Sequence, residues 1–318
     1  MDAVLLTLGL VLLLGAGDAL VRGAVALSLR LGVPAVLIGA TVVGFGTSAP
    51  ELLITVQAAL ADAPGIALGN VVGSNIANVF LVLGLPALMA SLGGAGADAR
   101  RNLYVMLGAT AVFSLLLLPG TLWRPSGALL AGVCLAMLYD SVRSGMAARA
   151  GDERAALAKL AELEDVDPHM ATWKVVALIG IGLVGLPLGA DFLIDGARGI
   201  ADTFGISEAV IGLTVVAVGT SLPELATTLA AALRREADVA IGNVVGSNIF
   251  NITGIIGIAA LVSPLAVPAE ILGRDLWWMI GASLVLAPYV WLGRRISRPV
   301  GGVLLAVYGF YIYHAFSG

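Results

Sequence analysis

The sequence has little charge and few side chains that bind transition metals. Charged residues make up 12% of the 318 residues, whereas an ordinary soluble domain carries about a quarter. The chain has two histidines and a single cysteine, Cys134. One cysteine excludes an internal disulfide framework and a thiolate metal cluster. We expect no cofactor and no nucleic-acid partner.

The chain is rich in long runs of apolar residues. Hydrophobic residues make up 59% of the chain, and the mean hydropathy is +1.01. A run of about twenty apolar residues can cross a bilayer as a helix. The sequence therefore predicts an all-α polytopic membrane protein with ten transmembrane helices. The predicted spans are residues 3–29, 34–60, 65–91, 102–120, 125–146, 172–203, 207–233, 238–262, 272–292 and 299–316.

The distribution of positive charge predicts the orientation in the membrane. Most Lys and Arg residues fall on the side of the polar segment 147–171, whereas the opposite loops carry Arg124 and Arg274. Positively charged loops stay in the cytoplasm. We therefore expect a cell-membrane protein with a cytoplasmic central loop and both termini outside. No Lys or Arg precedes Arg22, so the opening apolar run is predicted to be a first span and not a cleaved signal peptide.

One polar motif interrupts the apolar runs twice. GTSAPE at residues 46–51 is followed by GNVVGSNIAN at 69–78, and GTSLPE at 219–224 is followed by GNVVGSNIFN at 242–251. Every position of the second copy follows the first by 173 residues. Each repeat holds five spans, an odd number, so the second repeat is inserted upside down relative to the first. Inverted repeats with a shared site at the membrane midplane are typical of transporters. The predicted division is 1–146 for the first five-helix repeat, 147–171 for the linker and 172–318 for the second.

The motifs place oxygen atoms at membrane depth. Pro50 and Pro223 disturb helical hydrogen bonds and free backbone carbonyl groups nearby. The following spans carry polar stripes at four-residue intervals, and Gly69 and Gly73 allow close helix approach. The stripes are Asn70, Ser74 and Asn78, and Asn243, Ser247 and Asn251. Because these motifs contain neither His nor Cys, the oxygen set favours a hard cation over zinc, copper or iron.

Glu51 and Glu224 are the carboxylates of the motifs. Ionisable residues inside a membrane span are functional by default, and two carboxylates would neutralise one divalent cation. An intramembrane hydrolase is disfavoured because Ser48 and Ser221 have no His or Lys base in the motif. We therefore predict a transporter and not an enzyme.

The repeated motif pair resembles the two alpha-repeats of the sodium/calcium exchanger family, in its prokaryotic type, within the cation/calcium exchanger superfamily. The resemblance implies a ten-span inverted-repeat fold and antiport of Na⁺ against Ca²⁺ by alternating access. By the same resemblance, Glu51 and Glu224 bind Ca²⁺ and Na⁺ in turn. Further ligands implied by it are the hydroxyls of Thr47, Ser48, Ser74, Thr220, Ser221 and Ser247 and the carbonyls of Gly44 and Ala217, with Asn78 and Asn251 at the middle positions.

The resemblance leaves the coupling ion open. Some relatives carry Asp at one of the middle positions, whereas both Asn78 and Asn251 are neutral here, which disfavours potassium dependence. The predicted function is extrusion of Ca²⁺ in exchange for Na⁺, with Ca²⁺, Na⁺ and the lipid bilayer as partners. Burial favours the protonated form of a carboxyl group, so a proton-coupled Ca²⁺ or cation antiporter is the alternative.

Two further charge pairs are expected near helix ends. Asp18 and Arg22 are four residues apart in the first span, and Asp195 and Arg198 are three apart in the sixth. Residues at these spacings face each other on a helix. Both pairs are predicted to be structural.

Overall fold

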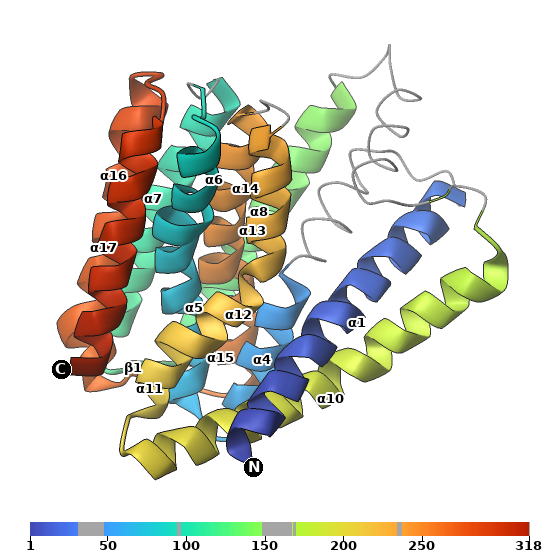
Figure 1. The fold of residues 1–318 in the computed structure, drawn as a ribbon, viewed down its shortest axis with the longest axis vertical. Coiled ribbons are helices and arrows are strands. Elements are labelled where there is room, and N and C mark those ends of the chain that lie inside the picture. Colours follow the sequence, from blue (N-terminus) through green and yellow to red (C-terminus); the bar gives the residue numbers. More distant parts are fainter. Residues whose placement is uncertain (31–47, 94–96, 148–166, 168–169, 234–236, 318) are drawn as a thin grey trace.

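The computed structural model describes residues 1–30, 48–93, 97–147, 167, 170–233 and 237–317. These residues form a helical bundle, with α1 and α10 side by side along one flank (Figure 1). Both labelled termini lie at the same end of the molecule (Figure 1). The linker 147–171 and the first part of the second predicted span fall largely outside the described residues.

The first half of the chain follows the predicted spans closely. The third span is divided into three consecutive segments. The elements of this half are α1 (Asp2–Arg30), α4 (Ala49–Leu60), α5 (Pro64–Ala77), η2 (Asn78–Val82), α6 (Gly84–Met89), α7 (Ala97–Leu117), β1 (Thr121–Leu122) and α8 (Arg124–Ala147).

The second half repeats this order. Its seventh span is bent by 45° between α12 and α13. The elements are α10 (Thr172–Phe204), α11 (Glu208–Ile211), η3 (Gly212–Val216), α12 (Ala217–Thr220), α13 (Leu222–Leu233), α14 (Ala237–Phe250), η4 (Asn251–Ile255), α15 (Ile256–Val262), β2 (Leu265–Ala266), η5 (Ile271–Asp275), α16 (Leu276–Trp291) and α17 (Arg298–Ser317).

Length and hydropathy alone identify fewer membrane spans than the order of elements described above. Five described helices are long and apolar enough to cross a membrane, and the bent pair Glu208–Thr220 and Leu222–Leu233 makes a sixth. Short or interrupted helices account for part of the difference. The ninth span, for example, consists of η5 joined to the 16 residues of α16.

Backbone pairing at the two ends of the bundle reflects the inverted repeat. At one end, β1 and β2 pair antiparallel, with Leu122 opposite Leu265. At the other end, Leu92 pairs antiparallel with Ile296. Leu265 follows Leu92 by 173 residues, and the membrane-spanning α7 lies between Leu92 and β1. Equivalent pairings therefore lie on opposite sides of the membrane, as an inverted repeat requires. This short sheet was not predicted from the sequence.

Close packing of small residues holds the two repeats together. A Cβ atom built on Gly73 of α5 would lie 2.4 Å from the Leu213 carbonyl oxygen of η3, and one on Gly69 would lie 2.7 Å from the Ala209 oxygen. These approaches confirm the predicted small-residue face. Lipid tails are as apolar as these side chains, so packing supplies the attraction that the hydrophobic effect supplies in water.

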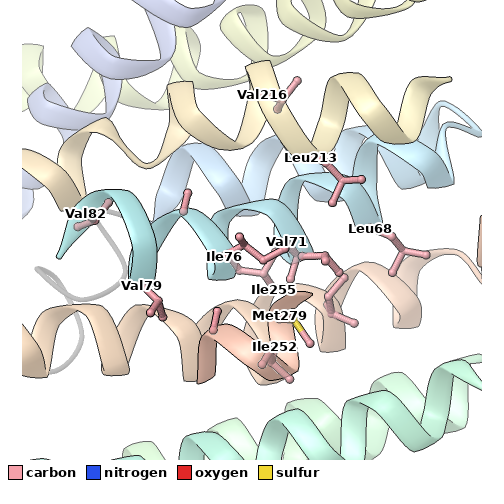
Figure 2. Close-up of a cluster of buried hydrophobic side chains, with 14 of the residues drawn as sticks. Leu68, Val71, Ile76, Val79, Val82, Leu213, Val216, Ile252, Ile255 and Met279 are labelled. Atoms are coloured by element: carbon pink, nitrogen blue, oxygen red, sulfur yellow. The ribbon is translucent and has the colours of Figure 1, made fainter. Parts of the chain in front are cut away.

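Apolar side chains of both repeats fill the centre of the bundle. Figure 2 shows Leu68, Val71 and Val79 of the third span in one cluster of buried side chains with Leu213 of the seventh span and Ile252 of the eighth. All five side chains are buried. The centre is therefore covered by protein and not by lipid, which is the condition for irregular backbone at membrane depth.

Gly73→Ala tests the packing between the repeats. The added methyl group meets the Leu213 backbone, so we expect a loss of about 1–3 kcal/mol in the free energy of unfolding. Thermal unfolding in detergent, followed by circular dichroism, measures the change. Gly108→Ala is the control, because a Cβ there meets nothing within 4 Å and Ala is favoured over Gly in a helix by about 0.5–1 kcal/mol. Equal stability of the two variants would contradict the packing described here.

Candidate functional site

Two broken spans place the motif glutamates deep in the protein. Glu51 lies in the first turn of α4 and Glu224 in the first turn of α13, and each is 1% exposed. Pro50 and Pro223 occupy the same first turns. A proline in the first turn removes no helical hydrogen bond. Each proline therefore lies at the start of a new half-helix, whereas the sequence predicted a proline that breaks a helix in its middle. The free N–H groups of a helix start also stabilise a negative charge.

The two glutamates share one site between the repeats. Ser48 Oγ, from the first motif, donates a 3.1 Å hydrogen bond to Glu224 Oε1 of the second motif. The side chains of Glu51 and Glu224 are close enough to interact electrostatically. The first motif therefore contributes a hydroxyl to the carboxylate of the second repeat.

An asparagine braces the backbone of each glutamate. Asn70 Nδ2 donates to the Glu51 carbonyl oxygen at 3.4 Å and to Thr55 Oγ1 at 3.0 Å. Asn243 Nδ2 donates to the corresponding atoms of Glu224 and Thr228, at 3.3 Å and 3.0 Å. The same bonds recur at the repeat offset. They fix each half-helix to the span that follows it.

Thr220 connects these braces across the repeats. Its hydroxyl donates to Asn70 Oδ1 at 3.1 Å and lies 3.3 Å from the Ala217 carbonyl oxygen. The same carbonyl accepts the backbone N–H of Ser221 at 3.1 Å. The Ala217 oxygen, predicted as an ion ligand, thus already accepts one backbone hydrogen bond.

Several buried oxygens have no donor directed at them. Glu51 Oε2, Ser74 Oγ, Asn78 Oδ1, Ser221 Oγ and Asn251 Oδ1 make no hydrogen bond within the described part of the chain. Buried polar atoms are almost always satisfied. Oxygen atoms that outnumber the hydrogen-bond donors near them are suited to bind a cation. Among the described residues, no group of three or more His, Cys, Asp or Glu side chains occurs.

Most of the residues predicted for the site are buried in the bundle, on elements of the two repeats that contact one another. Ser48, Glu51, Ser74 and Asn78 are buried in the first repeat, and the corresponding set is buried in the second: Ala217, Thr220, Ser221, Glu224, Ser247 and Asn251. Thr47 and Gly44 lie outside the described residues. The role of each of these residues as an ion ligand stays a prediction.

Sequence reasoning missed four buried polar residues that build the site. Thr55 and Thr228 accept from the bracing asparagines, and Asn75 and Asn248 meet where the repeats touch. The two threonines are 173 positions apart, and so are the two asparagines. Asn75 and Asn248 lie inside the repeated motifs but had no predicted role. Thr55 and Thr228 lie outside the motifs, and a comparison of the two halves at that offset would have found them.

The two predicted charge pairs have different outcomes. Arg22 Nε lies 3.0 Å from Asp18, which confirms that pair. The prediction for Asp195 was wrong. Arg198 instead forms an ion pair with Glu208 at 2.8 Å and donates to the Ala61 carbonyl oxygen at 2.7 Å. Glu208 begins a neighbouring helix, so the tertiary contact replaces the pairing within one helix.

Inverted repeats around a buried pair of carboxylates define a membrane transporter for cations and not an enzyme. The family model described as "Sodium/calcium exchanger protein" matches residues 1–140 and 174–317. The chain belongs to the sodium/calcium exchanger family.

Relatives and solved structures match nearly the whole chain. The inner membrane protein YrbG of Escherichia coli K12 is 37% identical, over 97% of this chain and 94% of its own. The sodium/calcium exchanger MaX1 of Methanosarcina acetivorans is 32% identical, over 96% and 95%. A structure of the sodium-calcium exchanger NCX_Mj soaked with Na⁺ and Sr²⁺ has a TM-score of 0.66 and 32% identity, over 98% and 97%. The likeness confirms the predicted ten-span inverted-repeat fold.

Cation binding is expected to stabilise the protein through both glutamates. Ca²⁺ at about 100 times its dissociation constant would add about 2.7 kcal/mol to the free energy of unfolding. The melting temperature of the purified protein, with and without Ca²⁺, measures this gain. Glu51→Gln and Glu224→Gln should each abolish most of the shift, because each removes half of the site's charge.

Glu208→Gln is the matched control for this experiment. Glu208 is also a carboxylate at the start of a helix, but it is about one-third exposed and pairs with Arg198. Its replacement should leave the shift with Ca²⁺ intact. An undiminished shift in both Glu51→Gln and Glu224→Gln would show that the cation binds elsewhere.

Proposed function

We propose that the protein is an antiporter that exchanges Na⁺ for Ca²⁺ and extrudes Ca²⁺ from the cytoplasm. The observation that carries this proposal is the pair of buried glutamates, one from each repeat, together with buried motif oxygens that accept no hydrogen bond from the described residues. A relative, MaX1, is named a sodium/calcium exchanger. Structures of NCX_Mj come from crystals soaked with Na⁺ and with Sr²⁺ or Ca²⁺.

Charge and ligand type support a divalent cation at the centre. Glu51 and Glu224 carry two negative charges when both are ionised, whereas Asn78 and Asn251 add oxygen without charge. One Ca²⁺ therefore leaves the site neutral. Ca²⁺ takes about six to eight oxygen ligands from carboxylates, carbonyls and amides, and the site offers these groups.

Na⁺ would use the hydroxyl groups of the same site. Ser48, Ser74, Thr220 and Ser221 are buried, and Ser48 donates a hydrogen bond to Glu224. With Thr47, Ser247 and the Gly44 and Ala217 carbonyls, they complete the ligand set that we propose. Ions that compete for the same carboxylates cannot occupy the site together, and exchange follows if only the loaded protein changes its access side.

The orientation that we propose has the central loop, 147–171, in the cytoplasm and both termini outside. In Figure 1 the two termini lie at the same end of the molecule, which agrees with an even number of spans. The repeats are assigned to 1–146 and 172–318, and the matching backbone pairings at opposite ends support this division. The relative YrbG is named an inner membrane protein, which supports a cell-membrane location.

A proton-coupled exchanger is the second candidate. The observation that favours it is the proximity of two buried carboxyl groups, since such a pair can share a proton. The second candidate has the same fold and the same central residues. It differs only in the ion that drives Ca²⁺ movement.

Flux in proteoliposomes separates the two candidates. We expect Ca²⁺ uptake to follow an opposing Na⁺ gradient, and not a K⁺ or pH gradient applied alone. Glu51→Gln and Glu224→Gln should each lower the Na⁺-driven rate to background, because the carboxylates bind both ions. Radioactive Ca²⁺ measures the rate, with Glu208→Gln as control. Uptake driven by the pH gradient without Na⁺ would favour the proton-coupled exchanger, and Na⁺-driven flux in both Gln variants would refute the assigned site.

Cysteine labelling tests the orientation. Asp62 lies in the loop between α4 and α5, and Arg295 lies between α16 and α17; both are exposed. A membrane-impermeant maleimide applied to intact cells should label Asp62→Cys and not Arg295→Cys, whereas both should react after permeabilisation. The buried native Cys134 is replaced by Ser in both variants. The reverse labelling pattern would mean that the central loop faces outward.

A further inference from the structure

Asn75 and Asn248 meet between the repeats and have no role in the proposed ligand set. Both side chains are 1% exposed. Asn248 Oδ1 accepts a hydrogen bond from Asn78 Nδ2 at 3.0 Å. Asn248 Nδ2 donates to the Asn75 carbonyl oxygen at 3.3 Å and lies 3.8 Å from Met106 Sδ. The Asn248 amide is thus held at both ends by groups of the first repeat.

This contact determines how Asn78 presents its own amide. With Nδ2 bound to Asn248, the remaining polar atom of the Asn78 side chain is Oδ1. That oxygen is buried and receives no hydrogen bond from the described residues. An amide oxygen buried without a donor is costly, so it is suited to accept a cation or a water that accompanies one.

The position of Asn78 links it to the glutamates. Asn70, Ser74 and Asn78 follow each other at four-residue intervals on one helix face, and Asn70 bonds the Glu51 backbone. Asn78 is also the first residue of the π-helical segment η2, as Asn251 is of η4. Such π-helical turns occur frequently at functional sites.

We propose that Asn248 is a positioning residue that orients the Asn78 amide, so that the Asn78 oxygen faces the transported cation. The proposal rests on the proposed function. Its equivalent in the other repeat, Asn75, is used differently: Asn75 Nδ2 donates to Val71 O of its own helix at 2.8 Å, and its Oδ1 accepts no bond from the described residues. In this conformation, therefore, Asn248 accepts a hydrogen bond from Asn78 across the repeats, whereas Asn75 Oδ1 accepts none from the described residues.

A double-mutant cycle on Ca²⁺ affinity tests this role. Calorimetric titration of the purified full chain with Ca²⁺ gives the dissociation constant. Asn248→Leu, which has similar volume and no acceptor, should weaken binding about tenfold or more. In the Asn78→Ala background the same change should matter less than about twofold, because there is no amide left to orient; interacting residues are expected to be non-additive in this way.

Asn248→Gln is the conservative variant. It keeps an amide acceptor for Asn78 Nδ2 and adds no charge, and we expect an affinity for Ca²⁺ within about threefold of the native protein. Thr253→Val is the control, because the Thr253 hydroxyl is fully buried and bonds its own helix at Ile249 O. It should leave the dissociation constant unchanged. Melting temperatures without ions record any purely structural effect separately.

The outcomes distinguish the proposal from the function on which it rests. If the native protein binds Ca²⁺ and Asn248→Leu weakens binding equally in both backgrounds, or not at all, the positioning role is refuted. If Asn248→Leu does not fold, the uncharged Asn248→Gln carries the test. A loss of affinity beyond about threefold that persists in the Asn78→Ala background then refutes the positioning role. A native protein that binds no Ca²⁺ contradicts the proposed function itself.

Discussion

The structure depends on keeping two carboxylates inside a protein that is surrounded by lipid. A charge buried at this depth is stable only if its surroundings compensate it. Glu51 and Glu224 each lie at the start of a half-helix, where free backbone N–H groups offset part of the charge. Ser48 reaches one of them from the opposite repeat. The helix breaks and the polar stripes are the means of this compensation.

Broken helices in turn require a cover of protein. Gly73 allows α5 to approach the backbone of η3 so closely that a methyl group would collide with it. Side chains from both repeats then fill the centre (Figure 2). Because this packing excludes lipid, the irregular backbone near Ser221 meets polar groups and not hydrocarbon. The burial of the glutamates therefore depends on the close packing that the glycines allow.

Most of the fold could be predicted from the sequence, because apolar length and an odd number of spans per repeat determine it. The principal site residues could be predicted for a similar reason, since a carboxylate in an apolar run is conspicuous. Contacts between distant segments could not. Arg198 has an acidic neighbour on its own helix, yet it pairs with Glu208. Asn248 carries no charge, and only the arrangement of the repeats shows that it meets Asn78.

The ion pair of Arg198 has a consequence for the resting state of the molecule. In a transporter of inverted repeats, two identical halves would make the inward-open and outward-open forms equal in energy. A preference for one form must come from residues that differ between the halves. Arg198 is such a residue, because Val25 occupies the equivalent position. Its bonds to Glu208 and Ala61 join three helices at one end of the bundle. A partly exposed pair is worth about 1 kcal/mol or less. A pair that forms in one form and breaks in the other would therefore shift the ratio of the two forms by up to about fivefold.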